Sequence, residues 1–448
     1  MSTDSADLTA IQRTPARRGR RKPPPDLWTF PLLVFAVHWI VSQIPATLAF
    51  VFGTTRPPLD PGATSGESWA YGIELGPMTG LAHLLVEPMR QWDGTWYRLI
   101  AATGYESLGA SFPAKAAFWP LYPWLMDLGS DLTGISPESV GYVISNFAFA
   151  GALILLYQLI SLDLSRDVAR RTLWAIAIFP TAFFFTAVYT ESLFLLLSVG
   201  CLLAARKGNW WLAGMIGLLA ALTRAAGVML LAPMGILFLQ QFGTDIRRWF
   251  PSILPAALPA LGPLMFGWHL TTAGLKFFDW IDVQWQWNRF RATPWETMEC
   301  ATVGCTAEVP NLGTFEARGV DWSWVDMLLD SPTWGTLTSA EFRDTVARGD
   351  WLELIVTIGA FVLLLIGIRR IPLYYFALVL PPLIVPLFSP STVHPLMSMP
   401  RFVLPMFPLF VVIALLIRKR EVGIALGVLS AAFMALLSMQ FANWYWVS

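Results

Sequence analysis

The sequence predicts an all-α polytopic membrane protein: a bundle of about eleven transmembrane helices, with amphipathic helices in its first outer loop. Of the 448 residues, 55% are hydrophobic and only 13% are charged. Apolar runs of about 20 residues recur along the chain, and a helix of this length crosses a bilayer. In the resulting topology, the lysines and arginines of the short loops all fall on one side, as the positive-inside rule requires.

The apolar runs also define the domain organisation. Residues 1–27 are basic and proline-rich and have no apolar side to bury, which predicts a disordered cytoplasmic tail. Residues 28–448 are expected to form one transmembrane domain that includes two long outer loops, 53–137 and 275–350. The spans are expected, to within several residues, at 28–52, 138–160, 172–189, 191–205, 211–222, 226–240, 251–272, 351–368, 371–388, 402–417 and 422–440.

The stretch 211–240 has three interpretations: one long helix, a short hairpin that turns near Thr223 and Arg224, or a kinked re-entrant pair. A single crossing would turn the later basic loops outward, against the positive-inside rule. The hairpin is therefore preferred, although the re-entrant pair satisfies the rule equally well.

The first outer loop contains an acid among aromatic residues, in the stretch QWDGTWYRLIAATGY. The helical spacing of its apolar side chains predicts a short amphipathic helix along the outer membrane surface, ending near Gly104. Asp93 would lie in the first turn, where a carboxylate that caps the helix contributes about 0.5–2 kcal/mol. The alternative is a catalytic base. The apolar stripe consists of Trp92, Trp96, Leu99 and Ile100.

Two further stretches are expected near this helix. In AFWPLYPWLMDL, Pro120 and Pro123 predict an irregular re-entry toward the membrane, or else an aromatic interface anchor. In YTESLFLLL, Thr190 is expected to cap a helix whose positive end favours Glu191. As a functional alternative, Glu191 is a second acid beside the same outer cavity.

Two arginines are predicted at the outer ends of spans, where the positive-inside rule makes arginine uncommon. They are Arg224 in ALTRAAG and Arg401 in HPLMSMPRFVLP. An intramembrane arginine costs about 2.5–3.5 kcal/mol on insertion scales, so each needs an anion. A phosphate suits the guanidinium fork, and an ion pair with Glu191 or another carboxylate is the alternative. His394, near Arg401, is a weaker candidate for the same site.

The second outer loop holds two nearby cysteines and a tryptophan-rich stretch, WIDVQWQWNRF. Cys300 and Cys305 suit a local disulfide in an oxidising compartment, with free thiols as the alternative. The tryptophans fit either an interface belt or a substrate-lining role.

These motifs, taken in order, resemble the PIG-V family, the GPI mannosyltransferase 2 group of membrane glycosyltransferases with the GT-C fold. The resemblance covers roughly 88–240 and 390–412, and its motifs place the family's aspartate on Asp93 and its glutamate on Glu191. It implies a catalytic acid in the first outer loop and a polyprenyl- or dolichyl-phosphate mannose donor. Trp119 stands where the family more often has phenylalanine, and 275–350 matches nothing in it. The motifs are WDGTWYRLIAATGY, AFWPLYP, YTESLF, LTRAAG and SMPRFVLPMFPLF.

The resemblance and the residues together predict an inverting glycosyltransferase that works on the extracytoplasmic face of a membrane. Asp93 would be the general base and Glu191 would orient the acceptor or assist a metal ion; a divalent metal is possible but unsupported. The acceptor would be a glycolipid, glycan or protein, and nothing indicates a nucleic acid. Residues expected to bind substrates are Trp92, Arg98, Tyr105, Tyr122, Arg224, His394 and Arg401.

Two other classes of function remain open on the sequence alone. A lipid-linked sugar transporter or flippase would also hold a phosphate, and a non-catalytic scaffold subunit would keep the same fold. The expected location is the plasma membrane of a bacterium, which the excess of arginine over lysine favours, or the endoplasmic reticulum of a eukaryote.

Overall fold

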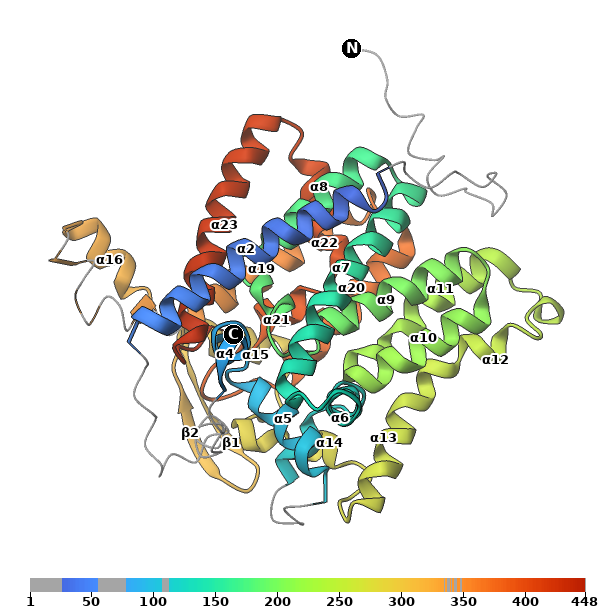
Figure 1. The fold of residues 1–448 in the computed structure, drawn as a ribbon, viewed down its shortest axis with the longest axis horizontal. Coiled ribbons are helices and arrows are strands. Elements are labelled where there is room, and N and C mark those ends of the chain that lie inside the picture. The colour runs from blue at the N-terminus through green and yellow to red at the C-terminus, as the bar shows by residue number, and fades with distance from the viewer. Residues whose placement is uncertain are drawn as a thin grey trace.

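The computed structural model describes residues 26–54, 78–106, 113–333, 335–336, 339, 341, 345–346 and 349–447. The predicted disordered tail falls almost wholly on residues 1–25, outside the described residues. Helices make up nearly all of the regular structure, and one small antiparallel sheet pairs β1 with β2 (Figure 1).

The elements follow one another along the chain in this order. The α-helices are α2 (Thr29–Phe52), α4 (Gly80–Leu85), α5 (Asp93–Thr103), α6 (Leu121–Thr133), α7 (Pro137–Asp163), α8 (Arg166–Ala177), α9 (Glu191–Arg206), α10 (Trp210–Thr223), α11 (Leu231–Phe242), α12 (Ile253–Ala256), α13 (Leu261–Thr272), α14 (Asp279–Asp282), α15 (Pro294–Val303), α16 (Ser323–Asp330), α19 (Asp350–Gly367), α20 (Leu373–Ile384), α21 (Met399–Val403), α22 (Phe407–Leu416) and α23 (Arg420–Ala442). The 3-10 helices are η1 (Glu87–Met89), η3 (Pro113–Ala117), η4 (Ala182–Phe185), η5 (Ala225–Leu230), η6 (Ile246–Arg248), η7 (Leu258–Ala260), η8 (Val283–Trp287) and η9 (Val385–Phe388), and the strands are β1 (Cys305–Val309) and β2 (Gly313–Ala317).

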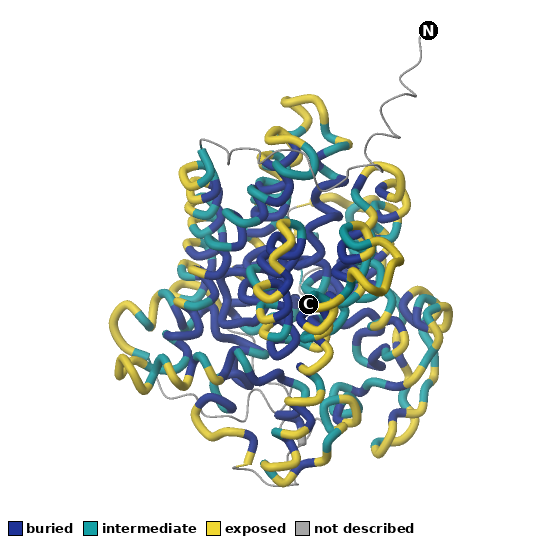
Figure 2. The backbone as a smooth tube through the Cα atoms, turned by 90° about the vertical axis from the view of Figure 1, so that its right-hand side faces the viewer, coloured by how far each residue is buried: buried dark blue, intermediate teal, exposed yellow. Residues whose placement is uncertain are grey.

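The centre of the bundle is formed by α7 and α9, which pack against each other and against α2, α8 and α10. Buried residues fill this centre, while exposed residues lie mainly toward the periphery (Figure 2). The core side chains are aromatic and aliphatic; for example, the ring of Phe149 in α7 stacks on that of Phe185 in η4, with the centroids 4.3 Å apart. Burial of such side chains is the main stabilising term of a packed helical core.

Five described helices are long and apolar enough to cross a membrane: Thr29–Phe52, Pro137–Asp163, Ala225–Phe242, Asp350–Gly367 and Arg420–Ala442. Several of them leave large apolar side chains exposed, as α23 does with Val428 and Leu429. Exposed apolar faces of this kind suit contact with lipid rather than with water. The prediction of an all-α polytopic membrane protein is thus confirmed.

Four of the predicted spans are interrupted in the structure. Proline is the common cause, because it removes a backbone donor and clashes with the preceding helical turn. The stretch 172–189 divides into α8 and η4, and 251–272 divides into α12, η7 and α13. Likewise 371–388 becomes α20 followed by η9, and 402–417 is shortened to α22. Among the described residues, five helices have the length and composition of a single span, and the count of about eleven transmembrane helices stays a prediction.

The turn predicted inside 211–240 is present. Helix α10 ends at Thr223, and Arg224 is extended, with φ −154° and ψ 152°. The following η5 packs back against α10, so the chain reverses direction at Arg224. One long helix is therefore excluded.

The first outer loop differs from prediction in two ways. Helix α5 is amphipathic, but Trp96 and Ile100 are each only 2% exposed, so its apolar stripe packs into the protein instead of lying on the membrane surface. The proline-rich stretch is the regular helix α6, not an irregular re-entry. Its prolines, Pro120 and Pro123, lie at the N-cap and in the first turn, where the missing N–H has no helical acceptor.

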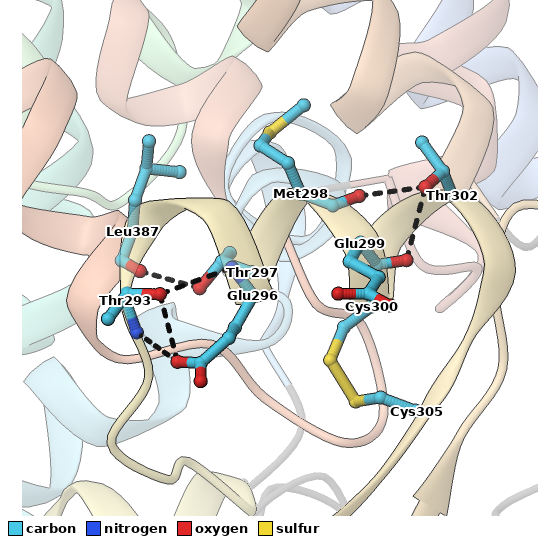
Figure 3. Close-up of a disulfide and its surroundings, with 9 residues drawn as sticks. All are labelled: Thr293, Glu296, Thr297, Met298, Glu299, Cys300, Thr302, Cys305 and Leu387. Carbon is cyan, nitrogen blue, oxygen red and sulfur yellow. Dashed lines mark hydrogen bonds between the residues drawn. A yellow bond between two sulfur atoms is a disulfide. The ribbon is translucent and has the colours of Figure 1, made fainter.

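The second outer segment folds against the bundle as a set of short elements, α14 to α16 with β1 and β2. Cys300 in α15 and Cys305 in β1 form a disulfide (Figure 3). Thr293 and Glu296 form a capping box at the start of α15. The hydroxyl of Thr297 donates to the carbonyl oxygen of Leu387 at 2.6 Å, which ties α15 to η9 (Figure 3).

The basic loops meet at the opposite end of the bundle from this segment. Arg170 donates to Asp26 at 2.6 Å, joining the starts of α8 and α2. Arg206 donates to Asp163 at 2.9 Å, joining the ends of α9 and α7. In Figure 1, α8 lies at the upper end and α5, α6, α14, β1 and β2 lie at the lower end. The positive-inside rule predicts that the end with these basic loops faces the cytoplasm, and this orientation stays a prediction.

Candidate active site

The start of α5 is fixed by the segment that precedes α9. The backbone N–H of Asp93 donates to the hydroxyl of Tyr189 at 3.0 Å, and this hydroxyl donates to the carbonyl of Gln91 at 3.1 Å. The backbone N–H of Val188 donates to the carbonyl of Met89 at 2.9 Å. These bonds place Asp93, the first residue of α5, beside Glu191, the first residue of α9.

The two acids and the two arginines predicted from the sequence form one cluster. Arg401 Nη1 donates to Asp93 Oδ2, and Arg401 Nε lies 3.3 Å from Glu191 Oε1. Arg224 Nη1 donates to the same oxygen of Glu191. The carboxylate of Glu191 is 1% exposed and is shared by the two guanidinium groups. In this structure Arg224 and Arg401 therefore both form ion pairs with carboxylates, which was the alternative to binding a phosphate.

Aromatic rings surround these guanidinium groups. The Cζ of Arg401 lies 5.3 Å from the ring centroid of Tyr189, and the Cζ of Arg224 lies 5.5 Å from that of Phe402. Such cation–π contacts favour the charged, oriented guanidinium. Thr190 occupies the N-cap of α9, but its hydroxyl makes no capping bond; it is 3.3 Å from the hydroxyl of Tyr97 and accepts from Arg224 at 3.4 Å. The predicted Thr190 cap is therefore wrong, because the hydroxyl is engaged by the cluster.

Backbone strain accompanies both ends of the Asp93–Arg401 pair. Trp92 precedes α5 with φ 56°, and Ser398 precedes α21 with φ 71°. Non-glycine residues held at positive φ cost about 1–3 kcal/mol and are concentrated at functional sites. The Asp93 carboxylate pairs with Arg401, and no capping bond from a side chain is found at the start of α5.

A cavity of about 1210 Å³ opens beside the cluster, and Trp92, Asp93, Arg224 and Arg401 line it. One part of its wall is aromatic, and another, from α20, η9 and α21, is aliphatic and proline-rich. A mixture of apolar wall and a few convergent polar groups is typical of a small-molecule site. The aromatic wall consists of Trp96, Phe118, Trp119, Trp280, Trp285 and Trp287.

Four other predicted substrate-binding residues do not line this cavity. Arg98 Nε donates to Glu138 at 2.7 Å, and Tyr105 donates to the carbonyl of Phe118 at 2.7 Å. Tyr122 donates to the carbonyl of Gly141 at 2.9 Å. His394 Nδ1 lies 2.5 Å from Asp350 Oδ1, and its ring stacks on Trp446. Their roles in substrate binding stay predictions, and the contacts just described are structural ones.

Two groups were missed by the sequence reasoning. Arg289 lines the cavity, but in the sequence it stands inside a tryptophan-rich stretch that drew attention to the aromatics. Asp350, Glu353 and His394 are buried, with possible ligand atoms within 4.8 Å of one another, a spacing that would suit a divalent cation. The spacing of Asp350 and Glu353 along one helix was a visible signal, but its pairing with His394 depends on the fold.

Replacing Gly227 with alanine is expected to destabilise the turn that presents Arg224. A Cβ on Gly227 would lie 2.3 Å from the carbonyl oxygen of Ala220, which is backbone and has little freedom to move. Overpacking of this kind costs about 1–3 kcal/mol. Thermal unfolding of the purified protein in detergent should show a lower Tm than in the parent. Gly235→Ala is the control, because nothing lies within 4 Å of its added Cβ; equal Tm values for both variants would contradict the expectation.

The helical bundle and the charged, aromatic cavity at one end define an integral membrane protein with a candidate site for a small polar substrate. Residues 78–248 match the family model described as mannosyltransferase (PIG-V). The match confirms the predicted resemblance, supports membership of the PIG-V family and indicates a glycosyltransferase of the mannosyltransferase type. It includes Asp93, Glu191 and Arg224 and ends before Arg401. Comparisons with curated proteins and with solved structures gave no match.

Proposed function

We propose that the protein transfers a sugar from a polyprenyl-phosphate donor to an acceptor hydroxyl, with inversion at the anomeric carbon. The proposed sugar is mannose. One observation carries the proposal: Asp93 lines the cavity, and of its two carboxylate oxygens only Oδ2 has a hydrogen-bond partner within the described part of the chain. Oδ1 is thereby available to accept a proton. A general base must lie within hydrogen-bond reach of the hydroxyl that it deprotonates.

The reaction is a single displacement. The acceptor oxygen attacks the anomeric carbon on the face opposite the phosphate, and a new C–O bond forms as the bond to the phosphate oxygen breaks. The lipid phosphate leaves with the electron pair, and the hydroxyl proton passes to Oδ1 of Asp93. Because attack and departure occur on opposite faces, the anomeric configuration inverts.

The other members of the cluster have supporting roles. Arg401 orients the Asp93 carboxylate through Oδ2, and Glu191 holds Arg401 and Arg224 in place. Preorganised cations also stabilise negative charge that develops on a leaving phosphate. The aromatic and aliphatic walls of the cavity suit the apolar surfaces of a sugar ring and a lipid chain.

The extracytoplasmic location of the reaction is part of the proposal. The cluster and cavity lie with the outer loops, and the ion-paired basic loops that join α2, α7, α8 and α9 lie at the other end. By the positive-inside rule the basic end faces the cytoplasm, which supports an outward-facing cavity.

The proposal is tested by incubating the purified protein with radiolabelled polyprenyl-phosphate mannose and a lipid extract from the source cells. Label is expected in a new product, and NMR of its anomeric centre should show the inverted configuration. Donor binding without transfer would support the transporter or scaffold alternative. A product with retained configuration would contradict the single displacement.

A further inference from the structure

Arg289 is a cation of the cavity wall, and no carboxylate of the described residues pairs with it by direct contact. Its Nη1 donates to the carbonyl of Ser389 at 2.6 Å and its Nη2 to the carbonyl of Met397 at 3.5 Å. Among the residues that the structure describes, it has no ion-pair partner within 4.0 Å. The residue is partly buried, and part of its surface faces the cavity. A buried guanidinium without a counter-ion is costly unless an anion binds to it.

The backbone around Arg289 is held rigidly to the same wall as Arg401. Residue Arg289 forms an isolated antiparallel bridge with Ser391, and the backbone N–H of Phe290 donates to the carbonyl of Pro390 at 3.0 Å. Asn288, just before it, adopts the left-handed conformation that asparagine tolerates better than most residues. A positive group fixed in this way is preorganised for a ligand, because little side-chain entropy remains to be lost on binding.

Arg289 adds a third arginine beside the two acids and two arginines of the cluster. Asp93 and Glu191 contribute two negative charges and Arg224, Arg401 and Arg289 three positive ones, so these five groups sum to +1 without Glu353. Burial lowers the pKa of Arg289 to about 10, and the charges of Glu353 and Asp93 oppose the effect of Arg401. Arg289 therefore remains charged at neutral pH. Glu353 lies behind the wall, where it accepts the backbone N–H of Ser398 at 3.3 Å.

We infer that Arg289 forms the binding subsite for the phosphate of the donor, with Arg401 beside it. This inference rests on the proposed function and revises its geometry. Arg224 and Arg401 are already ion-paired to the two acids, while the partners of Arg289 in the described part of the chain are backbone carbonyls. A phosphodiester carries one negative charge, and a guanidinium binds it through forked, charge-assisted hydrogen bonds. The phosphate monoester that leaves carries more, and Arg289 would stabilise it.

The inference is tested with purified parent, Arg289→Met and Arg289→Lys, and with Arg318→Met as the matched control. Arg318 belongs to the same outer segment but is exposed and does not line the cavity. Binding of polyprenyl monophosphate and of inorganic phosphate is measured by titration calorimetry in detergent, and transfer kinetics are measured with the lipid-phosphate donor. Melting curves and gel filtration establish that each variant is folded.

We expect Arg289→Met to weaken binding of polyprenyl monophosphate and to raise the KM for the donor, each by about 10- to 100-fold, the range for loss of a charged hydrogen bond. Arg289→Lys should restore part of the binding because it restores the charge without the fork. Arg318→Met should behave as the parent does.

The binding measurements test the phosphate subsite independently of sugar transfer, so failure of this inference can be told apart from failure of the proposed function. If the parent binds polyprenyl monophosphate and the methionine variant does not, the subsite is supported even where no transfer is found. Equal binding by the parent and a folded Arg289→Met variant would overturn the subsite even where transfer is robust. Inorganic phosphate bound as tightly as the lipid phosphate would overturn the lipid-linked ligand and identify free phosphate as the anion.

Discussion

Replacing Asp93 with asparagine is expected to lower kcat for sugar transfer by about 10²- to 10⁴-fold, the usual contribution of a general base. The asparagine oxygen can still accept a hydrogen bond from Arg401, and the backbone N–H at this position keeps its bond to Tyr189. The substitution removes the ability to take a proton and the negative charge that pairs with Arg401, while the size and shape of the side chain are kept. The measurement is steady-state transfer from the lipid-phosphate donor by folded protein, with KM for the donor determined separately.

Asp127→Asn is the matched control for this variant. Asp127 is an exposed acid on α6 in the same outer loop, and it does not line the cavity. Its replacement should leave kcat unchanged. If Asp93→Asn turned over as fast as the control, Asp93 would be a structural carboxylate at the start of α5 and not the base.

Replacing Arg401 with methionine is expected to destabilise the protein as well as to impair transfer. Arg401 separates the carboxylates of Asp93 and Glu191, and its side chain is only 12% exposed. Breaking a buried ion pair by removing one partner costs about 3–5 kcal/mol. We expect the low end of this range because Arg224 still donates to Glu191. Denaturant or thermal unfolding in detergent measures the loss.

A compensating variant distinguishes electrostatic from packing effects at this site. Adding Asp93→Asn and Glu191→Gln to Arg401→Met removes the two carboxylates along with their cation. The triple variant should regain stability relative to Arg401→Met while remaining inactive. Equal stability of the two would mean that the loss comes from packing around the Arg401 side chain, not from unpaired acids.

The local features of the chain were predictable from the sequence. Apolar runs identified a helical membrane protein because a bilayer accepts only backbone that bonds to itself. Arg224 marked the turn between α10 and η5, and Glu191 marked the start of α9. The nearness of Cys300 and Cys305 in the chain made their disulfide a plausible expectation. All of these depend on residues within a few positions of one another.

The effects of proline on the helices were predicted wrongly from the sequence. Pro120 and Pro123 were expected to prevent a helix, yet they begin α6, because the first turn needs no N–H donor from them. Prolines inside the apolar runs were passed over, yet the runs at 172–189 and 251–272 are broken. Hydropathy averages over a window, whereas a proline acts at one position within a helix.

What the sequence by itself determined is therefore the membrane class, the family resemblance and the set of charged residues that require partners. Only the tertiary structure decided which partners they have. Asp93 and Arg401 are 308 positions apart, and Glu191 meets both arginines. The fold pairs His394 with Asp350, and it places Arg289 at the cavity, where no carboxylate of the described residues contacts it. Charge pairing depends on distance in space, and distances between remote segments are set by packing of the whole bundle.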